Sequence, residues 1–368
     1  GAQGLLGQHC QRWEAMRAWS LAKHAISRST VQTARAVSNF DLQEHPVSRG
    51  VSYASNHYGW NPITNPAPEA PWRDQAAVEW PDFLGLDKWL RALDLDTIKA
   101  DYEQNGYAVV PEIIPSEVLP VYTDLHDRMI HGDIDARTHR HDLGSHKDEV
   151  IQGKENVGQI QWPMDFVKDG REGPLHQRAF AICQELLGAD TAFDFDMTIW
   201  KEGFTATETP WHQDEAYWPS GMTDKRAITV WCALDAATVD NGAMWFVKGS
   251  HKRALLRHQT AGEGSHILMT KEASETTPGA TCVPLAPGSA VLWHGRTVHY
   301  ARGNITAKSR RTFITNFRPE LMVKWERENG FDHLRLGFAD YEAQNAASGD
   351  VYKMSSTTTE TIKPAFAK

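Results

Sequence analysis

The chain has 368 residues, of which 41% are hydrophobic, so it can bury one large core and still carry additions to it. Its formal net charge of −9 and the absence of a basic run argue against a nucleic-acid partner. The four cysteines form no C-x-x-C pair and no apolar run reaches membrane-spanning length, so we expect free thiols in a reducing compartment, cytoplasmic or organellar, with no membrane span and no secretion signal.

The first hundred residues are predicted to form a helical and extended N-terminal extension that packs on the core. Residues 1–36 have helical spacing, and the first forty carry five Lys or Arg but one acid, a bias typical of a surface helix and also of an organellar transit peptide. Residues 50–82 are rich in proline and aromatic side chains, which favours an arm wrapped over a domain. Two helices should follow, one over 86–93 and one capped by Asp96 and ending near Gly106.

From residue 107 onward, helices give way to many short strands. A strand is predicted at 107–110 and helices at 116–130 and 175–187. Six further strands are expected at 192–200, 226–234, 242–247, 281–285, 289–293 and 312–317. This order indicates an α+β fold with a barrel or jelly-roll core. We therefore divide the chain into an extension at 1–100, a core domain at 101–320 and a C-terminal extension at 321–368 with a poorly ordered end.

The residues with the clearest chemistry lie in one short motif and two later positions. His212 and Asp214 are two residues apart, so on a strand their side chains point to the same face. His299 follows much later, and Arg310 stands eleven positions beyond it. Two imidazoles and one carboxylate leave three positions of an octahedral Fe(II) open, and a guanidinium suits the remote carboxylate of an α-keto diacid. The residues thus indicate an iron site that also binds a keto acid.

Other residues compete for these roles. The H-x-D pattern at 131–133 follows a helical stretch without a partner strand, so we expect a surface cluster at a helix end. His294 lies five positions before His299, and on one strand the two would face opposite sides, so at most one reaches the metal. The same rule predicts that Arg310 points inward and Arg311 points to solvent or to acidic neighbours.

Longer segments carry a resemblance to a known family. They are Trp211–Asp214, Asp240–His251 and Pro287–His299, followed by Asn304 and Arg310. On these segments, residues 101–320 resemble the phytanoyl-CoA dioxygenase family of Fe(II)- and 2-oxoglutarate-dependent oxygenases. The resemblance implies a double-stranded β-helix, a cupin-like jelly roll with flanking helices. It also implies iron on His212, Asp214 and His299, and the C5 carboxylate of 2-oxoglutarate on Arg310.

The same resemblance assigns further positions. Arg310 stands at the family's distance from His299, which favours His299 as the ligand and leaves His294 beside the pocket. The family positions that contact or line the cosubstrate correspond to Trp231, Met197 and, more loosely, Gln159. Thr312 shares a strand face with Arg310, so its hydroxyl would extend the carboxylate clamp.

Residues around the metal motif are candidates for contact with the substrate. They are Trp211, Glu215, Trp218, Gln161, Trp162, His294 and Arg296, each of which also has an ordinary alternative in packing the barrel mouth or in a surface ion pair. The aromatic rim and the lack of an extended basic surface favour a small-molecule substrate, amino-acid-like or another carboxylate. The oligomeric state is not indicated by the sequence.

The expected activity is hydroxylation of an unactivated C–H bond with O₂ and 2-oxoglutarate, releasing succinate and CO₂. One alternative is desaturation or oxidative cyclisation with the same cofactors, and another is a cupin-like metalloenzyme that does not use 2-oxoglutarate. A non-catalytic jelly-roll protein would be expected to lack a ligand or Arg310, and all four residues are present. The Asp214 carboxylate argues against halogenation, because related halogenases have a small residue there that leaves room for chloride.

Overall fold

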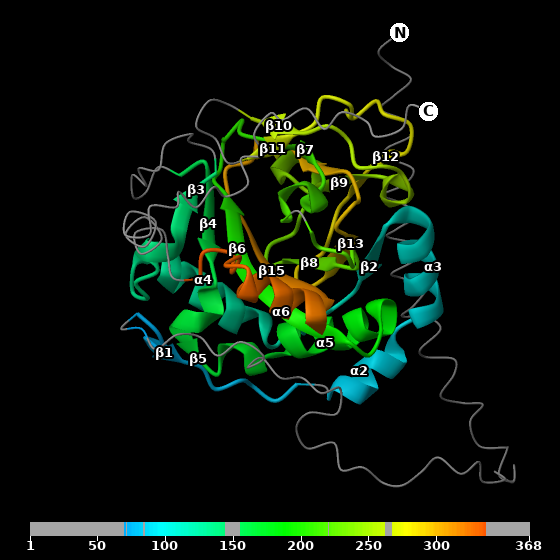
Figure 1. Cartoon of the computed structure of the whole chain (residues 1–368). Helices are drawn as coiled ribbons and strands as arrows, with labels where there is room; N and C mark the ends of the chain where they lie inside the picture. The colour runs from blue at the N-terminus through cyan, green and yellow to red at the C-terminus, as the bar shows by residue number, and fades with distance from the viewer. Residues whose placement is uncertain are drawn as a thin grey trace, which may run out of the picture. The chain divides into compact units, whose positions relative to one another are not determined.

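A computed structural model describes residues 70, 72–83, 85–143, 155–219, 221–261 and 267–335 (Figure 1). The predicted helix at 1–36, most of the arm at 50–82 and the end beyond residue 350 lie outside these residues. The division into three parts at residues 100 and 320 stays a prediction.

Two antiparallel sheets form the core. The larger has the strand order β2-β13-β8-β15-β6-β4-β3 and the smaller β12-β9-β14-β7. The larger sheet consists of β2 (Tyr107–Val110), β3 (Arg140–Asp142), β4 (Val157–Gln161), β6 (Thr191–Lys201), β8 (Ile228–Ala233), β13 (Ala290–His294) and β15 (Arg310–Pro319). The smaller consists of β7 (Thr209–His212), β9 (Met244–Val247), β12 (Ala280–Val283) and β14 (His299–Ala301). From β6 to β9 and from β12 to β15, successive strands alternate between the sheets, which is the predicted double-stranded β-helix.

The interior between the sheets is filled by side chains from both. Trp231, Val291 and Ile314 of the larger sheet pack in one buried cluster with Met244 and Phe246 of the smaller. Apolar burial of this kind stabilises the sandwich by roughly 25 cal/mol per Å² removed from water. This apolar cluster joins the two sheets across the interior.

Strand β15 is buried on both faces. Ile314 belongs to the interior cluster, whereas Phe313 belongs to a second cluster shared with the helices. Because side chains alternate, Arg310 lies on the interior face with Ile314 and Arg311 on the outer face. The predicted outward position of Arg311 is confirmed, since it forms ion pairs with Asp127 and Asp235.

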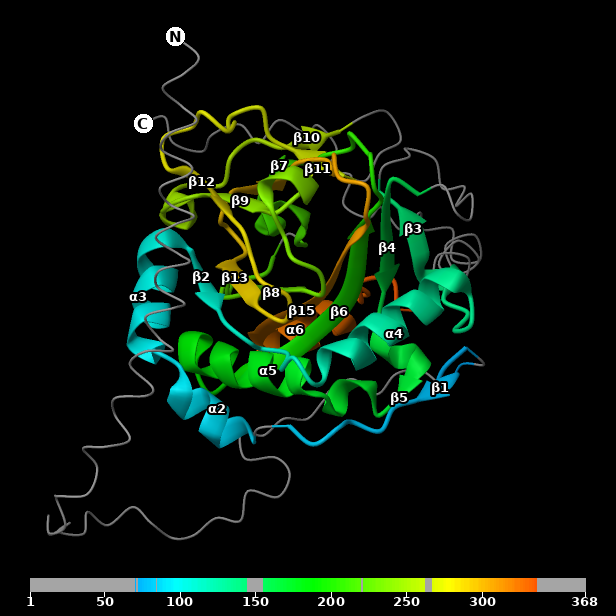
Figure 2. The ribbon, with the colours of Figure 1, turned by 180° about the vertical axis from the view of Figure 1, so that it is seen from behind.

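Helices cover the outer face of the larger sheet (Figures 1 and 2). They include α4 (Leu119–His131) and α5 (Pro174–Leu187), whose side chains Leu125 and Phe180 join the cluster of Phe313. The remaining helices take other places: α2 (Leu86–Ala92) packs on α5, α3 (Leu95–Asn105) contacts β2, and α6 (Glu320–Glu328) contacts β6 and β15 and packs against Trp218 and Met222. Among the described residues, none of these helices is both long and apolar enough to cross a bilayer.

One helix boundary differs from the prediction. Asp94 rather than Asp96 caps α3, because the Asp94 carboxylate accepts the backbone N–H of Thr97, the third residue of the helix. Asp96 instead lies in the first turn, where its charge still favours the helix dipole. The predicted end of the helix at Gly106 is confirmed by the left-handed φ of +83°.

Two short strand pairs lie beside the core. β1 (Ala76–Ala77) runs parallel to β5 (Val167–Lys168), so the described part of the predicted arm lies against the domain. Trp80 strengthens this contact by donating its Nε1–H to the Asp169 carbonyl at 2.9 Å. The hairpin of β10 (Gln259–Thr260) and β11 (Leu268–Met269) adjoins the free edge of β7, where the Thr270 N–H bonds the Trp211 carbonyl at 2.8 Å.

Candidate metal centre

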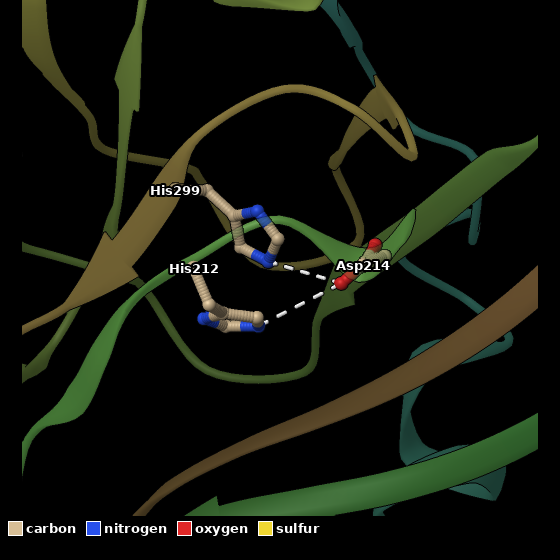
Figure 3. Close-up of side chains that lie close together, drawn as sticks. All are labelled: His212, Asp214 and His299. Carbon is tan, nitrogen blue, oxygen red and sulfur yellow. Dashed lines mark ion pairs between the residues drawn. The ribbon is translucent and has the colours of Figure 1, made fainter. Parts of the chain in front are cut away.

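Three side chains from two paired strands converge at one end of the interior (Figure 3). His212 ends β7 and His299 begins β14, and the two are direct partners in the antiparallel register. Asp214 follows two residues beyond the end of β7, after Gln213. Its Oδ1 lies 3.6 Å from Nε2 of His212 and 3.3 Å from Nε2 of His299. The three ligand atoms all lie within 4.8 Å of one another, which is the spacing a shared metal ion requires.

Each imidazole is held in the tautomer that metal binding requires. His212 donates its Nδ1–H to the Pro210 carbonyl at 2.7 Å, and His299 donates its Nδ1–H to the Thr297 carbonyl at 2.9 Å. A carbonyl can only accept, so Nδ1 carries a proton, and Nε2, which faces Asp214, is the nitrogen left for a metal. Burial, reinforced by the neighbouring His299, lowers the pKa of His212 to about 3, so this ring is neutral at physiological pH.

Asp214 is held so that one oxygen is free. Its Oδ2 accepts the indole N–H of Trp293 at 2.9 Å and the hydroxyl of Thr229 at 3.0 Å, while Oδ1 faces the two histidines. Burial alone would raise the pKa of Asp214, but His299 and His212 reverse that effect and lower it, so the group is a carboxylate. A single carboxylate oxygen and two imidazole nitrogens form a donor set suited to Fe(II), with room for further ligands.

Trp293 and Thr229 were not predicted as site residues. Parity offered a signal for Thr229, because it lies two positions before Trp231 on β8 and so shares its interior face. Nothing in the sequence pairs Trp293 with Asp214, because that contact depends on how the two sheets pack.

Arg310 lies deeper in the same interior. It is 2% exposed, its guanidinium stands 5.1 Å over the ring of Trp231, and one terminal nitrogen, NH1, has no partner. Its Nε–H has only a long contact of 3.4 Å to the Asn241 carbonyl. Burial lowers the pKa of Arg310 to about 10, which still leaves it cationic at neutral pH. A buried, under-bonded guanidinium requires an anion.

Lys201, which was not predicted as a site residue, adds a second buried positive charge that favours an anion beside Arg310. It is the direct cross-strand partner of Arg310 and is 1% exposed. Its Nζ donates to the carbonyls of Thr207, Ala301 and Arg302, at 3.2, 3.1 and 2.7 Å, which uses all three ammonium protons. Like charges directly opposite one another are destabilising, and the nearby Asp235 is already engaged by Arg311. The pocket thus fits the carboxylate of a keto diacid, with Arg310 as its hydrogen-bond donor.

The other predicted cosubstrate residues share this interior. Met197 is the register partner of Ile314, which in turn pairs with Trp231, so the three lie in one row across the sheet. Gln159 donates to the sulfur of Met197 at 3.0 Å. Thr312 lies on the face of Arg310, but its hydroxyl hydrogen is engaged by the Ile199 carbonyl at 2.9 Å. Their contacts with a cosubstrate stay predictions.

Several predicted substrate residues point away from the metal ligands. Trp211 stacks on Tyr300, with ring centroids 4.8 Å apart, in a cluster on the other face of β7 from His212. Trp162 is buried and donates its Nε1–H to the carbonyls of Asp332 and His333. The structure therefore does not bring either tryptophan to the site.

His294 requires a correction. It ends β13, whereas His299 begins β14, so the two do not share a strand as expected. The His294 ring lies near His251 and Tyr102, and its Nδ1 accepts the N–H of Arg296 at 2.9 Å. A turn separates His294 from His299, and on β13 His294 alternates with Trp293, whose indole bonds Asp214, so His294 lies on the opposite face.

The remaining candidates lie near the rim. Glu215 is 7% exposed and binds Arg296 through two hydrogen bonds of 2.6 and 2.8 Å, so the two charges satisfy each other. Trp218 stacks against Arg318 at 4.1 Å. Gln161 is the register partner of Met197, and its buried Oε1 has no hydrogen-bond partner. Gln161 is thus the predicted substrate residue with a free polar atom on the interior side.

The H-x-D pattern at 131–133 lies where the sequence predicted it. His131 is the last residue of α4, it is exposed, and Gly132 ends the helix with a φ of +90°. Neither His131 nor Asp133 belongs to a group of potential metal ligands within the described residues.

Comparison with known proteins identifies the family. The phytanoyl-CoA dioxygenase (PhyH) family model matches residues 102–312, which is more than half of the chain. The chain therefore belongs to this family of Fe(II)- and 2-oxoglutarate-dependent oxygenases. The predicted family and fold are thereby confirmed.

Individual relatives are more distant. The chain is 26% identical over 141 residues to phytanoyl-CoA dioxygenase of Arabidopsis thaliana, covering 38% of this chain and 49% of that protein. It is 26% identical over 222 residues to ectoine dioxygenase of Streptomyces avermitilis, covering 56% of this chain and 72% of that protein. With the Caenorhabditis elegans homolog of phytanoyl-CoA dioxygenase domain-containing protein 1 it shares 29% identity over 131 residues, 34% of this chain and 42% of that protein. The chain thus spans about half the length, or less, of the relatives from Arabidopsis thaliana and Caenorhabditis elegans.

A solved structure supports the fold over a longer stretch. EvdO2 from Micromonospora carbonacea var. aurantiaca, crystallised with 2-oxoglutarate, superposes with a TM-score of 0.53 at 26% identity. The match covers 64% of this chain and 93% of EvdO2.

Proposed function

We propose that the protein uses iron held by His212, Asp214 and His299, with the C5 carboxylate of 2-oxoglutarate on Arg310, to hydroxylate a C–H bond of a small-molecule substrate. The observation that carries this proposal is the position of Asp214 Oδ1, 3.6 and 3.3 Å from the two imidazole nitrogens. No Lys or Arg side chain pairs with this oxygen among the described residues, so a metal ion is the natural partner of the group.

Bound iron and 2-oxoglutarate would together activate O₂, with 2-oxoglutarate converted to succinate and CO₂. The chain's own residues supply orientation. Trp293 and Thr229 hold Asp214 so that it offers one oxygen, which keeps coordination positions free. The unpartnered nitrogen of Arg310 orients the far carboxylate, and Trp231 below the guanidinium limits its movement.

Gln161 supports a substrate that carries a hydrogen-bond donor. Its free amide oxygen faces the interior beside Met197, and a buried acceptor without a partner costs free energy until a donor reaches it. Arg296 is less suited to a substrate carboxylate than the sequence suggested, because Glu215 already occupies its guanidinium. We therefore propose an amino-acid-like or other small polar substrate whose hydroxyl or amine bonds Gln161.

The proposal is tested by succinate release. The full chain, loaded with Fe(II) without oxygen, should release succinate from 2-oxoglutarate when O₂ is admitted, and a true substrate from a panel of small polar metabolites should accelerate this release. Asp214→Ala should abolish it. Succinate formed without added metal, or by the Asp214→Ala variant at the normal rate, would overturn the metal assignment. Mass spectrometry of the product separates hydroxylation, which adds one oxygen atom, from desaturation or ring closure, which removes two hydrogens.

A further inference from the structure

Gln213, the residue between two of the proposed ligands, is bonded at every polar group. It is 0% exposed. Its carbonyl accepts the N–H of Ala216 at 3.0 Å, and its amide side chain accepts the Leu256 N–H at 2.9 Å and donates to the Arg296 carbonyl at 2.7 Å. Its backbone N–H donates at 3.1 Å to Nε2 of His258. The short link between His212 and Asp214 is therefore fixed from three directions.

The Gln213 N–H, which bonds His258, has no hydrogen-bond partner in a neighbouring strand. β7 is the edge strand of the smaller sheet, and the segment after β11 bonds its outer side at Trp211, whereas the Gln213 N–H bonds a side chain, His258. The chain at 256–258 runs along this edge and provides an imidazole acceptor at the position of Gln213. A buried N–H left without an acceptor is unfavourable, so this bond constrains where residue 213 can lie.

The hydrogen bonds determine the tautomer of His258. Its Nδ1 lies 2.9 Å from the Leu256 carbonyl, which can only accept, so Nδ1 carries the proton and Nε2 carries the lone pair. This is the arrangement of the two proposed metal-binding histidines, each of which also donates Nδ1–H to the carbonyl two residues earlier. In His258 the lone pair meets the Gln213 N–H and so cannot bind a metal. The ring instead supports the peptide that joins two ligands.

The network reaches the third ligand as well. The Arg296 carbonyl that accepts from Gln213 belongs to the residue before Thr297, whose own carbonyl orients His299. Gln213 thus connects the His212–Asp214 segment both to 256–258 and to the segment that holds His299. A shift of residue 213 would alter all three ligand positions.

We propose that His258 is a positioning residue of the metal centre, acting through the Gln213 backbone N–H to keep His212 and Asp214 in register with His299. This inference rests on the proposed function, because it assumes that these three residues bind the metal. Groups that support metal ligands typically contribute ten- to hundredfold in metal affinity, roughly, and we expect an effect of that size here.

The test compares two amide replacements in the full chain. His258→Gln places an amide oxygen at about the reach of Nε2 and can accept from Gln213, whereas the shorter His258→Asn reaches only as far as Nδ1. Fe(II) affinity is measured without oxygen by competition with a chromophoric chelator. We expect His258→Asn to bind Fe(II) about ten- to hundredfold more weakly and His258→Gln to recover most of that loss. Thermal unfolding of each metal-free variant gives its folded fraction at the assay temperature, so that Fe(II) affinity is compared per folded molecule and positioning is separated from general destabilisation.

His251→Asn is the matched control. His251 is a similar, partly buried histidine, but its ring contacts the Glu103 carbonyl at 3.2 Å and lies outside the Gln213 network. Its variant should bind Fe(II) as the wild-type chain does. Wild-type affinity in His258→Asn, equal losses in both His258 variants, or the same loss in His251→Asn would overturn the proposal while leaving the proposed function intact. A wild-type chain that does not bind Fe(II) would overturn both.

Discussion

Two groups of histidine and carboxylate side chains among the described residues bring three potential metal ligands within 4.8 Å of one another. One is His212, Asp214 and His299, between the sheets. The other is Asp194, Glu326 and His333, where β6 meets α6 and the segment that follows it. By distance alone the two are equivalent, and their surroundings decide which can bind a metal.

In the second group, guanidiniums already occupy the carboxylates. Arg318 lies 2.7 Å from Asp194 and 3.3 Å from Glu326, and Arg327 lies 2.6 and 3.4 Å from the same two residues. A metal ion there would have to displace two buried cations. In the first group, Asp214 is held by neutral donors, so its negative charge remains available. Charge balance, more than proximity, separates a metal site from a structural ion cluster.

The histidines differ in the same way. Burial alone would lower the pKa of His333, but Asp194 and Glu326 overcome it and raise the pKa, so this ring tends to hold a proton. A protonated imidazole has no lone pair for a metal. His212 has a pKa lowered to about 3 and keeps its lone pair free.

Removing one carboxylate from each group should give the largest effects: loss of activity at the first group and loss of stability at the second. Asp214→Ala should eliminate Fe(II)-dependent succinate release, because a ligand contributes more than the roughly tenfold to hundredfold in metal affinity of a residue that only supports one. The metal-free variant should keep the far-UV circular dichroism of the wild type. Normal turnover in this variant would place the metal elsewhere.

Asp194→Asn should lower the stability of the chain and leave its Fe(II) binding unchanged. It leaves the two buried guanidiniums with Glu326 as their one remaining carboxylate in this group, so the free energy of unfolding should fall by about 3–5 kcal/mol. Urea denaturation of the metal-free chain measures this loss. Fe(II) affinity per folded molecule should not change, and a variant of full stability that lost iron would reverse the roles of the two groups.

The adjacent residues Arg310 and Arg311 of β15 allow cosubstrate binding to be compared with structural ion pairing. Arg310→Ala should raise the 2-oxoglutarate concentration for half-maximal succinate release by about ten- to hundredfold, since a hydrogen bond to a charged group contributes about 1.5–3 kcal/mol. The Fe(II) requirement should change much less. Arg311→Ala removes the ion pairs with Asp127 and Asp235 and should affect stability without changing the 2-oxoglutarate requirement. Equal effects of the two variants on 2-oxoglutarate would show that the carboxylate clamp is misplaced.

Substitution of Trp293 or Trp162 by phenylalanine should have smaller effects, which again separate Fe(II) binding from stability. Trp293→Phe keeps an aromatic ring but removes the N–H that holds Asp214, and should weaken Fe(II) binding by about tenfold. Trp162→Phe removes the N–H that bonds the Asp332 and His333 carbonyls, and should cost about 1 kcal/mol of unfolding free energy without changing Fe(II) affinity. Chelator competition and urea denaturation on both variants measure the two effects. A loss of iron in Trp162→Phe instead would contradict the assignment.

The smallest effect concerns pH. Burial, as the largest cause, lowers the pKa of His212 to about 3 and that of His294 to about 4, whereas the unfolded rings titrate near 6.5. The unfolded state therefore binds more protons between these values, and the metal-free chain should lose stability as the pH falls from 6.5 toward 4. Urea denaturation at a series of pH values should show that His212→Gln flattens this acidic decline.

His333 should change the pH dependence of stability in the opposite direction to His212. Because its pKa is raised in the folded chain, its contribution is fully present below 6.5 and is lost as the pH rises through the raised value. His333→Gln should therefore reduce stability most at acidic pH, with a difference from the wild type that shrinks as the pH rises. A stability loss that grows with pH would mean that His333 is neutral in the fold.

Much of the site could be predicted because it rests on local periodicity. Arg310, Thr312 and Ile314 share the interior face of β15 as the alternation of a strand requires, and His212 and Asp214 lie on one side of β7 and its extension. Contacts that depend on packing escaped prediction. Trp211 faces away from the metal beside Tyr300, and Glu215 neutralises the Arg296 that the sequence offered to a substrate.

By itself, the sequence determined the kind of elements, the side of each strand on which a residue lies, and the set of two histidines, one aspartate and one arginine. These follow from backbone geometry and residue chemistry, which act between near neighbours in the chain. Only the tertiary structure decided that His294 and His299 lie on different strands, that Trp293 and Thr229 hold Asp214, and that His258 supports Gln213. Those contacts join residues far apart in the chain, and they depend on strand register and on the packing of one sheet against the other, which no local period encodes.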